Sequence, residues 1–283
     1  MRTLRIFFRS ILLVVTCLMI AVYTQAQSES AVSHNELAQE QEQEKTLRGK
    51  ELHLTEAENP LTKAERAWLK EHPRVRVAIM NNWPPLNFVN DKGMPEGIGV
   101  NYFRLLQKRI DVDFEIVPGI FADNIQAVKE KRIDVLMDVN PLVDREKYLH
   151  FTQPYLTIPH VIVARINGPY YENEKTLIGK TVVLERGSSI AQYFRENFPS
   201  VKVAEHKDTV SCLQAVAKGE ADAYVGNRVV AAYFKAMEVL YTLQIQGSFS
   251  ARESILALGV RKDWPEFAGI LDKALDSLSY EEQ

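Results

Sequence analysis

Short runs of β-branched and aliphatic residues alternate with amphipathic stretches along most of this 283-residue chain, and this alternation constrains the fold more than any other feature. The apolar runs have the length of strands, and the stretches between them carry apolar residues at helical spacing. Such alternation favours an α/β fold with largely parallel sheets. The predicted strands are 75–79, 114–117, 135–137, 161–164, 181–184, 201–203, 223–225 and 255–260, and the predicted helices are 100–110, 125–131, 189–197, 210–218, 229–239 and 266–278.

One segment of the first half of the chain recurs in altered form in the second half. Residues 127–135 and 215–223 each pass from the end of a predicted helix through an Asp into a predicted strand. This echo predicts two similar lobes, and in open α/β sheets ligands bind at the carboxyl ends of the strands. The alternative is that helix-to-strand turns often look alike without a larger repeat.

The first 26 residues have the order of a secretory signal peptide. Three Arg precede an almost wholly apolar run at 10–23, and small residues ending in Ala26 offer a cleavage site. The run is shorter than the ~20 residues that a membrane span usually needs, although an uncleaved anchor is the alternative. Both interpretations predict export, and we expect a periplasmic location. Cleavage would leave Cys212 as the only thiol, so no internal disulfide is expected.

The segment after the signal peptide is polar. Residues 27–60 are rich in Glu, Gln and Ser, which predicts a linker that buries little surface. A lead-in helix is expected at 61–73, because Thr62 and Glu65 fit a capping box.

Several classes of function lack support in the sequence. The net charge of −3 and the lack of any Lys/Arg cluster argue against a nucleic-acid partner. The six His show no metal-ligand spacing, and Gly179-Lys180-Thr181 lacks the earlier Gly of a phosphate-binding loop. We therefore expect no metal, no cofactor and no enzyme activity in this chain. A pair of carboxylates brought together only in space would escape this survey.

Three loops carry residues suited to binding a small molecule. Trp83 follows the first strand in a loop stiffened by two Pro, where it could form a stacking wall or fill the core. Arg145 could grip a carboxylate through its planar guanidinium, or form an ordinary exposed ion pair. Gly187, Ser188 and Ser189 join a strand to a helix, where they could hold an anion or simply cap the helix.

Ordered motifs between residues 61 and 281 carry a resemblance to a known family. They are Leu61-Thr62, Trp68-Leu69, Arg76-Val77-Ala78, Trp83-Pro84-Pro85-Leu86-Asn87-Phe88, Gly97-Ile98, Ile133-Asp134-Val135-Leu136, Asp144-Arg145, Phe151-Thr152-Gln153-Pro154-Tyr155, Gly179-Lys180, Gly187-Ser188, Ala221-Asp222-Ala223-Tyr224-Val225-Gly226-Asn227 and Arg261-Lys262-Asp263-Trp264-Pro265-Glu266. In these motifs the chain resembles the family-3 periplasmic solute-binding proteins and, within them, the Venus-flytrap sensor domains of BvgS-type hybrid histidine kinases.

The resemblance implies a two-lobed periplasmic-binding-protein (type II) fold of the α/β class. Two hinge strands, expected near 159–163 and 254–258, would join the lobes. Lobe 1 would comprise 74–158 plus 256–281, and lobe 2 would comprise 159–255. Ligand binding between the lobes would then close them in a hinge motion.

The resemblance also implies a binding site. Arg145 matches the Arg that grips the α-carboxylate in the family's amino-acid binders, whereas Leu142 stands at the position of a family Thr. The lobe-2 Asp that holds the α-ammonium is matched by Asn227, so we expect an anionic or neutral ligand, such as a carboxylate, rather than a zwitterionic amino acid. The expected ligand-binding residues are Trp83, Phe88, Asn140, Leu142, Arg145, Gly187, Ser188, Ser189 and Asn227.

Three functions remain in view. The first is the ligand-sensing module of a membrane receptor of sensor-kinase type, whose kinase or cyclase domains would lie beyond Gln283. The second is a free substrate-binding protein of an ABC importer. The third, a periplasmic dehydratase-like enzyme, has the least support because no acid–base pair stands out. The ligand's identity and the oligomeric state stay open.

Overall fold

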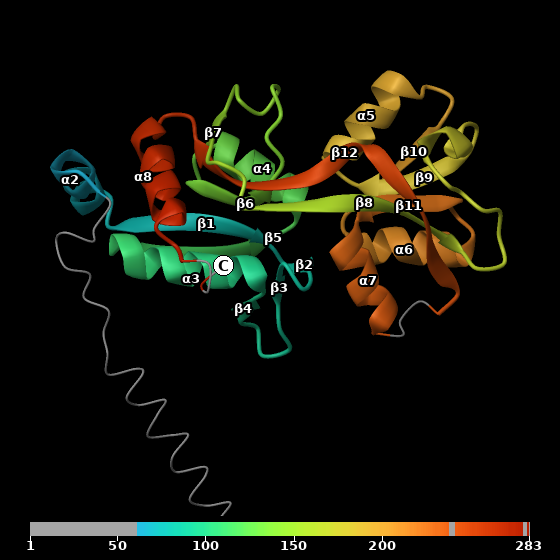
Figure 1. The fold of residues 1–283 in the computed structure, drawn as a ribbon, viewed down its shortest axis with the longest axis horizontal. Coiled ribbons are helices and arrows are strands. Elements are labelled where there is room, and N and C mark those ends of the chain that lie inside the picture. Colours follow the sequence, from blue (N-terminus) through green and yellow to red (C-terminus); the bar gives the residue numbers. More distant parts are fainter. Residues whose placement is uncertain (1–60, 238–240, 280–281, 283) are drawn as a thin grey trace, which may run out of the picture. The chain divides into compact units, whose positions relative to one another are not determined.

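A computed structural model describes residues 61–237, 241–279 and 282, all within one compact unit, Leu54–Gln283. The predicted signal peptide and linker lie outside the described residues. Within the described part, a nine-stranded sheet has the order β10-β9-β11-β8-β12-β6-β1-β5, with β7 paired to β12. Two lobes share this sheet (Figure 1). No helix of the described ranges combines the length and the apolar composition needed to cross a bilayer.

Lobe 1 is built around three parallel strands. β1 pairs in parallel with β5 and with β6, and a three-stranded sheet, β2-β3-β4, lies in the segment after β1. The helix α2 precedes this lobe, and α8 follows the last strand. The elements are α2 (Lys63–Glu71), β1 (Arg74–Met80), β2 (Asn82–Trp83), β3 (Asn87–Val89), β4 (Pro95–Glu96), α3 (Ile98–Ile110), β5 (Asp113–Gly119), α4 (Phe121–Lys129), β6 (Val135–Val139), β7 (Leu149–Phe151) and α8 (Pro265–Asp276).

Lobe 2 repeats the parallel arrangement. β9 pairs in parallel with β10 and with β11. The elements of this lobe are a 3₁₀ turn η1 (Glu174–Leu177), β9 (Thr181–Glu185), α5 (Ser189–Asn197), β10 (Lys202–His206), α6 (Thr209–Lys218), β11 (Ala223–Asn227) and α7 (Arg228–Ala236).

Two long antiparallel strands, β8 (Leu156–Arg165) and β12 (Leu243–Arg261), run from one lobe to the other (Figure 1). β12 pairs with β8 as far as Leu256 and with β6 from Ala257 onward. The predicted hinge segments 159–163 and 254–258 lie within these strands. The predicted lobe limits of 74–158 plus 256–281 and 159–255 stay a proposal, since both crossing strands contribute to the two lobes.

Each lobe has apolar cores on both faces of its sheet. Successive residues of β1 alternate between cores: Val77 and Ile79 pack with α3 and α8, whereas Ala78 packs with α4. In β11, Tyr224 faces α6 and α7, and Val225 faces α5. Strand residues buried on both faces explain the continuous apolar runs of the sequence, because side chains alternate between the faces.

The internal echo corresponds to one local structure formed twice. Asp134 precedes β6 and accepts a hydrogen bond from the Arg76 backbone N–H at 2.9 Å. Asp222 precedes β11 and accepts one from the Thr181 backbone N–H at 2.8 Å. In both lobes the Asp therefore ties the start of one parallel strand to the start of its neighbour.

The predicted elements are confirmed in place, with different limits. The predicted helix at 125–131 begins earlier, at Phe121, and the predicted helix at 229–239 ends at Ala236 within the described residues. The predicted strand at 255–260 was wrong in length, because β12 begins at Leu243. The first half of β12 is rich in Gln and Ser, and this half is extended because it pairs with β8. The capping box between Thr62 and Glu65 is confirmed.

We predict that Asp134→Asn lowers the free energy of unfolding by about 3 kcal/mol, because it removes the buried negative charge that two Arg share. Asp134 is 2% exposed and forms ion pairs with Arg76 at 2.8 Å and Arg261 at 2.9 Å. Burial alone raises the pKa of Asp134, but the hydrogen bonds from these two Arg outweigh it and hold the pKa below its ordinary value. The deficit should therefore be largest at neutral pH and shrink as the pH falls through the folded-state pKa.

Urea unfolding at several pH values measures this deficit. Asp113→Asn is the matched control, since its pairing with Arg74 spans 3.8 Å between exposed side chains. That control should change stability by less than about 1 kcal/mol. Equal effects of the two substitutions would contradict the assignment.

Candidate functional site

A cavity lies between the lobes, at the carboxyl ends of the parallel strands. It encloses about 750 Å³ of non-atom space, its open mouth included. All six parallel strands lead into it, as expected for ligand sites in α/β sheets, and the crossing strands also contribute residues to its lining. The lining residues are Met80, Asn81, Asn82, Trp83, Gly119, Ile120, Phe121, Asp138, Asn140, Arg145, His160, Glu185, Ser188, Ser189, Ile190, Lys207, Asp208, Thr209, Gly226, Asn227, Ser254 and Leu256.

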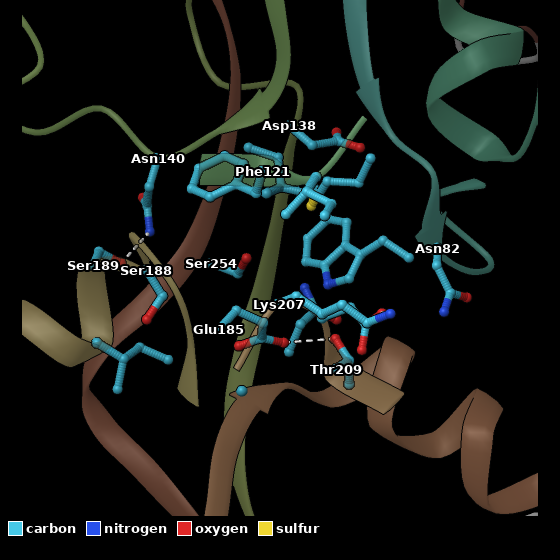
Figure 2. A pocket seen from close by; sticks show the side chains of 18 of the residues that line it. Asn82, Phe121, Asp138, Asn140, Glu185, Ser188, Ser189, Lys207, Thr209 and Ser254 are labelled. Carbon is cyan, nitrogen blue, oxygen red and sulfur yellow. Dashed lines mark hydrogen bonds and ion pairs between the residues drawn. The ribbon is translucent and has the colours of Figure 1, made fainter. Parts of the chain in front are cut away.

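Two aromatic side chains from lobe 1 line the cavity. Trp83 is half-buried and packs against the apolar core of lobe 2 that contains Tyr224, so it contacts both the cavity and a core. Phe121 opens α4 and projects over the cavity (Figure 2). The loop that presents Trp83 is anchored by buried Asn87, which accepts a hydrogen bond from the Met80 backbone N–H at 2.6 Å.

Arg145 is buried and bonds to both lobes. Its Nη1 donates to the backbone carbonyl of Asn140 at 2.9 Å, and its Nη2 donates to that of Gly187 at 3.0 Å. Its guanidinium lies 5.3 Å from the centre of the Phe121 ring. Among the described residues, no carboxylate forms an ion pair with Arg145, and burial lowers the pKa of Arg145. A buried cation held by neutral groups, here two backbone carbonyls, the Phe121 ring and the Tyr148 side chain, retains donors that an anion could accept.

The start of α5 faces Arg145 from lobe 2. The Ser188 hydroxyl accepts a hydrogen bond from the Ala191 backbone N–H at 3.2 Å, so Ser188 is the N-cap that the sequence allowed for. Ser189 is buried, and its Oγ accepts a hydrogen bond from Nδ2 of Asn140 at 3.3 Å. Figure 2 shows this contact between the lobes.

Asn227 ends β11 and caps α7. Its Oδ1 accepts hydrogen bonds from the backbone N–H groups of Val229 at 3.0 Å and Val230 at 3.2 Å. The side chain is 2% exposed, and its Nδ2 has no hydrogen-bond partner among the described residues.

Two carboxyl groups that sequence analysis missed line the same cavity. Asp138, near the end of β6, accepts hydrogen bonds from Asn87 and Tyr155, and burial raises its pKa to about 6. Glu185, the last residue of β9, accepts hydrogen bonds from Thr209 at 2.6 Å and from Tyr224 at 2.7 Å. Burial also raises the pKa of Glu185. The sequence signal that could have located both residues was an acid at or near the end of a predicted buried strand.

His160 and Ser254 were also missed, because they lie within the crossing strands β8 and β12 rather than in loops. Both are buried and line the cavity. In the described part of the chain, no group of three or more His, Cys, Asp or Glu residues could hold a metal ion.

The structure brings six of the nine predicted site residues to the cavity: Trp83, Asn140, Arg145, Ser188, Ser189 and Asn227. Phe88, Leu142 and Gly187 are not among its lining residues. Phe88 pairs with Asn82 and Glu96 in the small sheet, and Leu142 lines a separate surface hollow. Gly187 contributes the carbonyl that holds Arg145, at a φ of +79°.

Comparisons with known proteins agree with this architecture. The sequence profile of the bacterial extracellular solute-binding proteins, family 3, matches residues 75–283. The virulence sensor protein BvgS of Bordetella pertussis is 28% identical over 235 residues, which cover 83% of this chain and 19% of the relative. The L-cystine-binding protein TcyJ of Escherichia coli is 28% identical over 194 residues, covering 67% of this chain and 72% of the relative.

A solved structure shares the fold. The crystal structure of the periplasmic VFT2 domain of Bordetella pertussis BvgS superposes with a TM-score of 0.70 at 29% identity, covering 78% of this chain and 94% of that one. The chain thus matches a binding or sensing domain in each case, and it spans 19% of the length of the sensor relative.

We predict that Asp138→Asn removes part of the pH dependence of stability. The raised pKa means that the folded state binds this proton more tightly than the unfolded state. Protonation therefore stabilises the fold at low pH, and this contribution is lost as the pH rises through about 6. Asn suits the site because Asp138 has a φ of +50°, a conformation that Asn tolerates.

The readout is the stability of the parent chain minus that of the variant. From pH 7 to pH 5 this difference should rise by about 1.4 kcal/mol, as the raised pKa requires. Denaturant unfolding of both chains at the two pH values measures it. A difference that does not change with pH would show that Asp138 keeps its charge across this range.

Proposed function

Since the chain belongs to the family 3 bacterial extracellular solute-binding proteins, we propose that it binds a small molecule between its lobes as the ligand-sensing module of a membrane receptor of sensor-kinase type. The similarity to BvgS along 83% of the chain supports the sensory role. We further propose a periplasmic location, in keeping with the extracellular family.

The observation that carries the binding function is the unpaired cation in the cavity. Arg145 is 6% exposed, and two of its five N–H donors hold backbone carbonyls at 2.9 and 3.0 Å. Burying a charge without a counter-charge is costly. An anionic group on the ligand would offset that cost and accept the remaining donors. We therefore propose a carboxylate-bearing ligand with its carboxylate on Arg145.

Closure of the lobes follows from the same contacts. Arg145 of lobe 1 donates a hydrogen bond to the backbone carbonyl of Gly187 in lobe 2. Asn140 of lobe 1 donates one to the hydroxyl of Ser189 in lobe 2. A ligand anion on Arg145 would add contacts available only when the lobes are closed. Ligand binding would then shift the population toward the closed form.

An alternative is a free substrate-binding protein of an ABC importer. The similarity to the L-cystine-binding protein TcyJ, 28% identical over 67% of this chain, favours it. Both functions use the same cavity and differ in the partner that detects closure: receptor domains in one case and a permease in the other. Deleting the gene and measuring ligand uptake separates them, because uptake falls only if the chain serves an importer.

A dehydratase-like enzyme is the remaining candidate. We propose that the chain has no enzyme activity, but Asp138 and Glu185 put two carboxyl groups of raised pKa in one cavity, an arrangement that acid–base catalysis can use. Incubation with cyclohexadienyl acids, followed by ultraviolet detection of an aromatic product, tests this. Product formation that Glu185→Gln abolishes would establish the enzyme instead.

We predict that a carboxylate ligand raises the melting temperature and that Arg145→Ala abolishes the shift. A ligand at about 100 times its dissociation constant adds roughly 2.7 kcal/mol to stability. For a chain of this size, that corresponds to an increase of about 5–10 °C. A thermal-shift screen of aliphatic and aromatic carboxylates, amino acids, polyamines and sugars measures the effect. Arg145→Lys should restore little, since an ammonium lacks the planar fork.

Arg186→Ala is the matched control, because Arg186 is an exposed Arg beside the same turn and does not line the cavity. It should leave the shift unchanged. Equal losses in the Arg145 and Arg186 variants, or a ligand shift that survives Arg145→Ala, would contradict the binding role of Arg145.

We also predict that glutarate binds more tightly than glutamate, with at least a tenfold difference in dissociation constant. Asn227 presents its amide N–H₂ where the family's amino-acid binders place an acid, so an ammonium near it would meet a donor. Calorimetric titration of both compounds, and of succinate with aspartate, measures the preference. Tighter binding of the amino acids would show that Asp138 or Glu185 holds an ammonium instead.

A further inference from the structure

The amide nitrogen of Asn227 is a hydrogen-bond donor that the protein leaves unused. The side chain is 2% exposed, and no group in the described part of the chain accepts a hydrogen bond from its Nδ2. A buried donor without an acceptor costs about 1–3 kcal/mol, so such groups are rare unless something else fills the role. Asn227 lines the cavity between the lobes, where a ligand atom could be that acceptor.

The orientation of this amide is fixed by the start of α7. Oδ1 accepts from two backbone N–H groups, those of Val229 and Val230. Only an acceptor satisfies two N–H donors, so the amide cannot rotate to exchange its oxygen and nitrogen. Nδ2 is therefore held as a donor, whatever the ligand is.

His160 provides a hydrogen-bond acceptor, whereas Nδ2 of Asn227 is a donor. Its Nδ1 lies 2.8 Å from the backbone carbonyl of Arg252. A carbonyl only accepts hydrogen bonds, so Nδ1 carries the proton. Burial lowers the pKa of His160 and favours the neutral ring, which leaves Nε2 as a lone-pair acceptor. Within the described residues, no group donates a hydrogen bond to Nε2.

The strand register sets these two groups side by side. Asn227 on β11 lies directly opposite His160 on β8 in the antiparallel ladder. Residues opposite each other in such a ladder project from the same face of the sheet. Both line the cavity, and Ser254 of β12 lines it as well, with its hydroxyl in the middle of Figure 2.

We propose that Asn227 and His160 form a subsite for a carboxamide, in which the ligand's C=O accepts from Asn227 and its N–H donates to His160. A carboxylate has only acceptors and would set an oxygen against the His160 lone pair. An ammonium has only donors and would face the N–H₂ of Asn227. An amide presents an acceptor oxygen and a donor nitrogen on the same carbon, and it alone of these three satisfies both residues.

This inference rests on the proposed function, in which Arg145 holds a carboxylate of the same ligand. Together the two subsites define the ligand class as a carboxylic acid that also carries a carboxamide. Half-amides of four- and five-carbon dicarboxylic acids are the simplest such compounds. They differ from succinate and glutarate only at the group that the subsite would recognise.

The test is calorimetric titration of the purified chain with succinamate, succinate, glutaramate and glutarate. We expect at least one half-amide to bind ten or more times more tightly than its diacid. Asn227→Asp keeps an oxygen to cap α7 but removes the donor, and His160→Phe keeps the ring packing against Phe249 but removes the acceptor. Each should weaken half-amide binding at least tenfold and abolish the preference.

His150→Phe is the control, because His150 also contacts a backbone carbonyl, that of Lys262 at 3.1 Å, but lies outside the cavity. It should bind like the parent chain. If His160→Phe does not fold by circular dichroism, Asn227→Asp decides the question alone.

Three results would overturn the inference. They are equal affinity for half-amide and diacid, a preference that survives both substitutions, and no binding of either half-amide. Binding of the diacids that Arg145→Ala abolishes, without any amide preference, would leave the proposed function standing and remove only the carboxamide subsite.

Discussion

The backbone ladder between β8 and β12 is the constraint on which the binding cavity depends. These strands pair from Leu243 to Leu256 on β12, and β12 then continues beside β6 of lobe 1. Because both strands cross between the lobes, the carboxyl ends of the two sets of parallel strands face each other over a common floor. His160 and Ser254 lie on that floor within the ladder itself. A hinge motion of the lobes would therefore move the walls of the cavity more than its floor.

Ionisable groups of both signs line the cavity. Arg145 carries a buried positive charge without a carboxylate partner among the described residues, whereas Asp138 and Glu185 are carboxyl groups held only by neutral donors. The raised pKa values of both acids express the cost of ionising a buried carboxyl group without a counter-charge. If ligand binding changes the ionisation of Asp138 or Glu185, protons are taken up or released, and ligand affinity then depends on pH.

Most of the fold followed from the pattern of residues. The alternation of apolar runs with amphipathic stretches located the parallel strands, because strands buried on both faces must be apolar throughout. The repeated Asp at 134 and 222 marked a hydrogen bond between neighbouring strands that forms once in each lobe. The first half of β12 escaped detection, since its Gln and Ser residues become extended only through pairing with β8, which is distant in sequence.

The sequence by itself determined which loops would supply Trp83, Asn140, Arg145, Ser188, Ser189 and Asn227, because residues that directly follow a parallel strand must lie at its carboxyl end. Only the tertiary structure decided what these groups do. Within the described part of the chain, Arg145 forms no ion pair with an acid, and Asn227 has an unused donor because the start of α7 occupies its oxygen. The partnership of His160 with Asn227 depends on strand register, which hydrogen bonds between distant segments fix and no local pattern encodes.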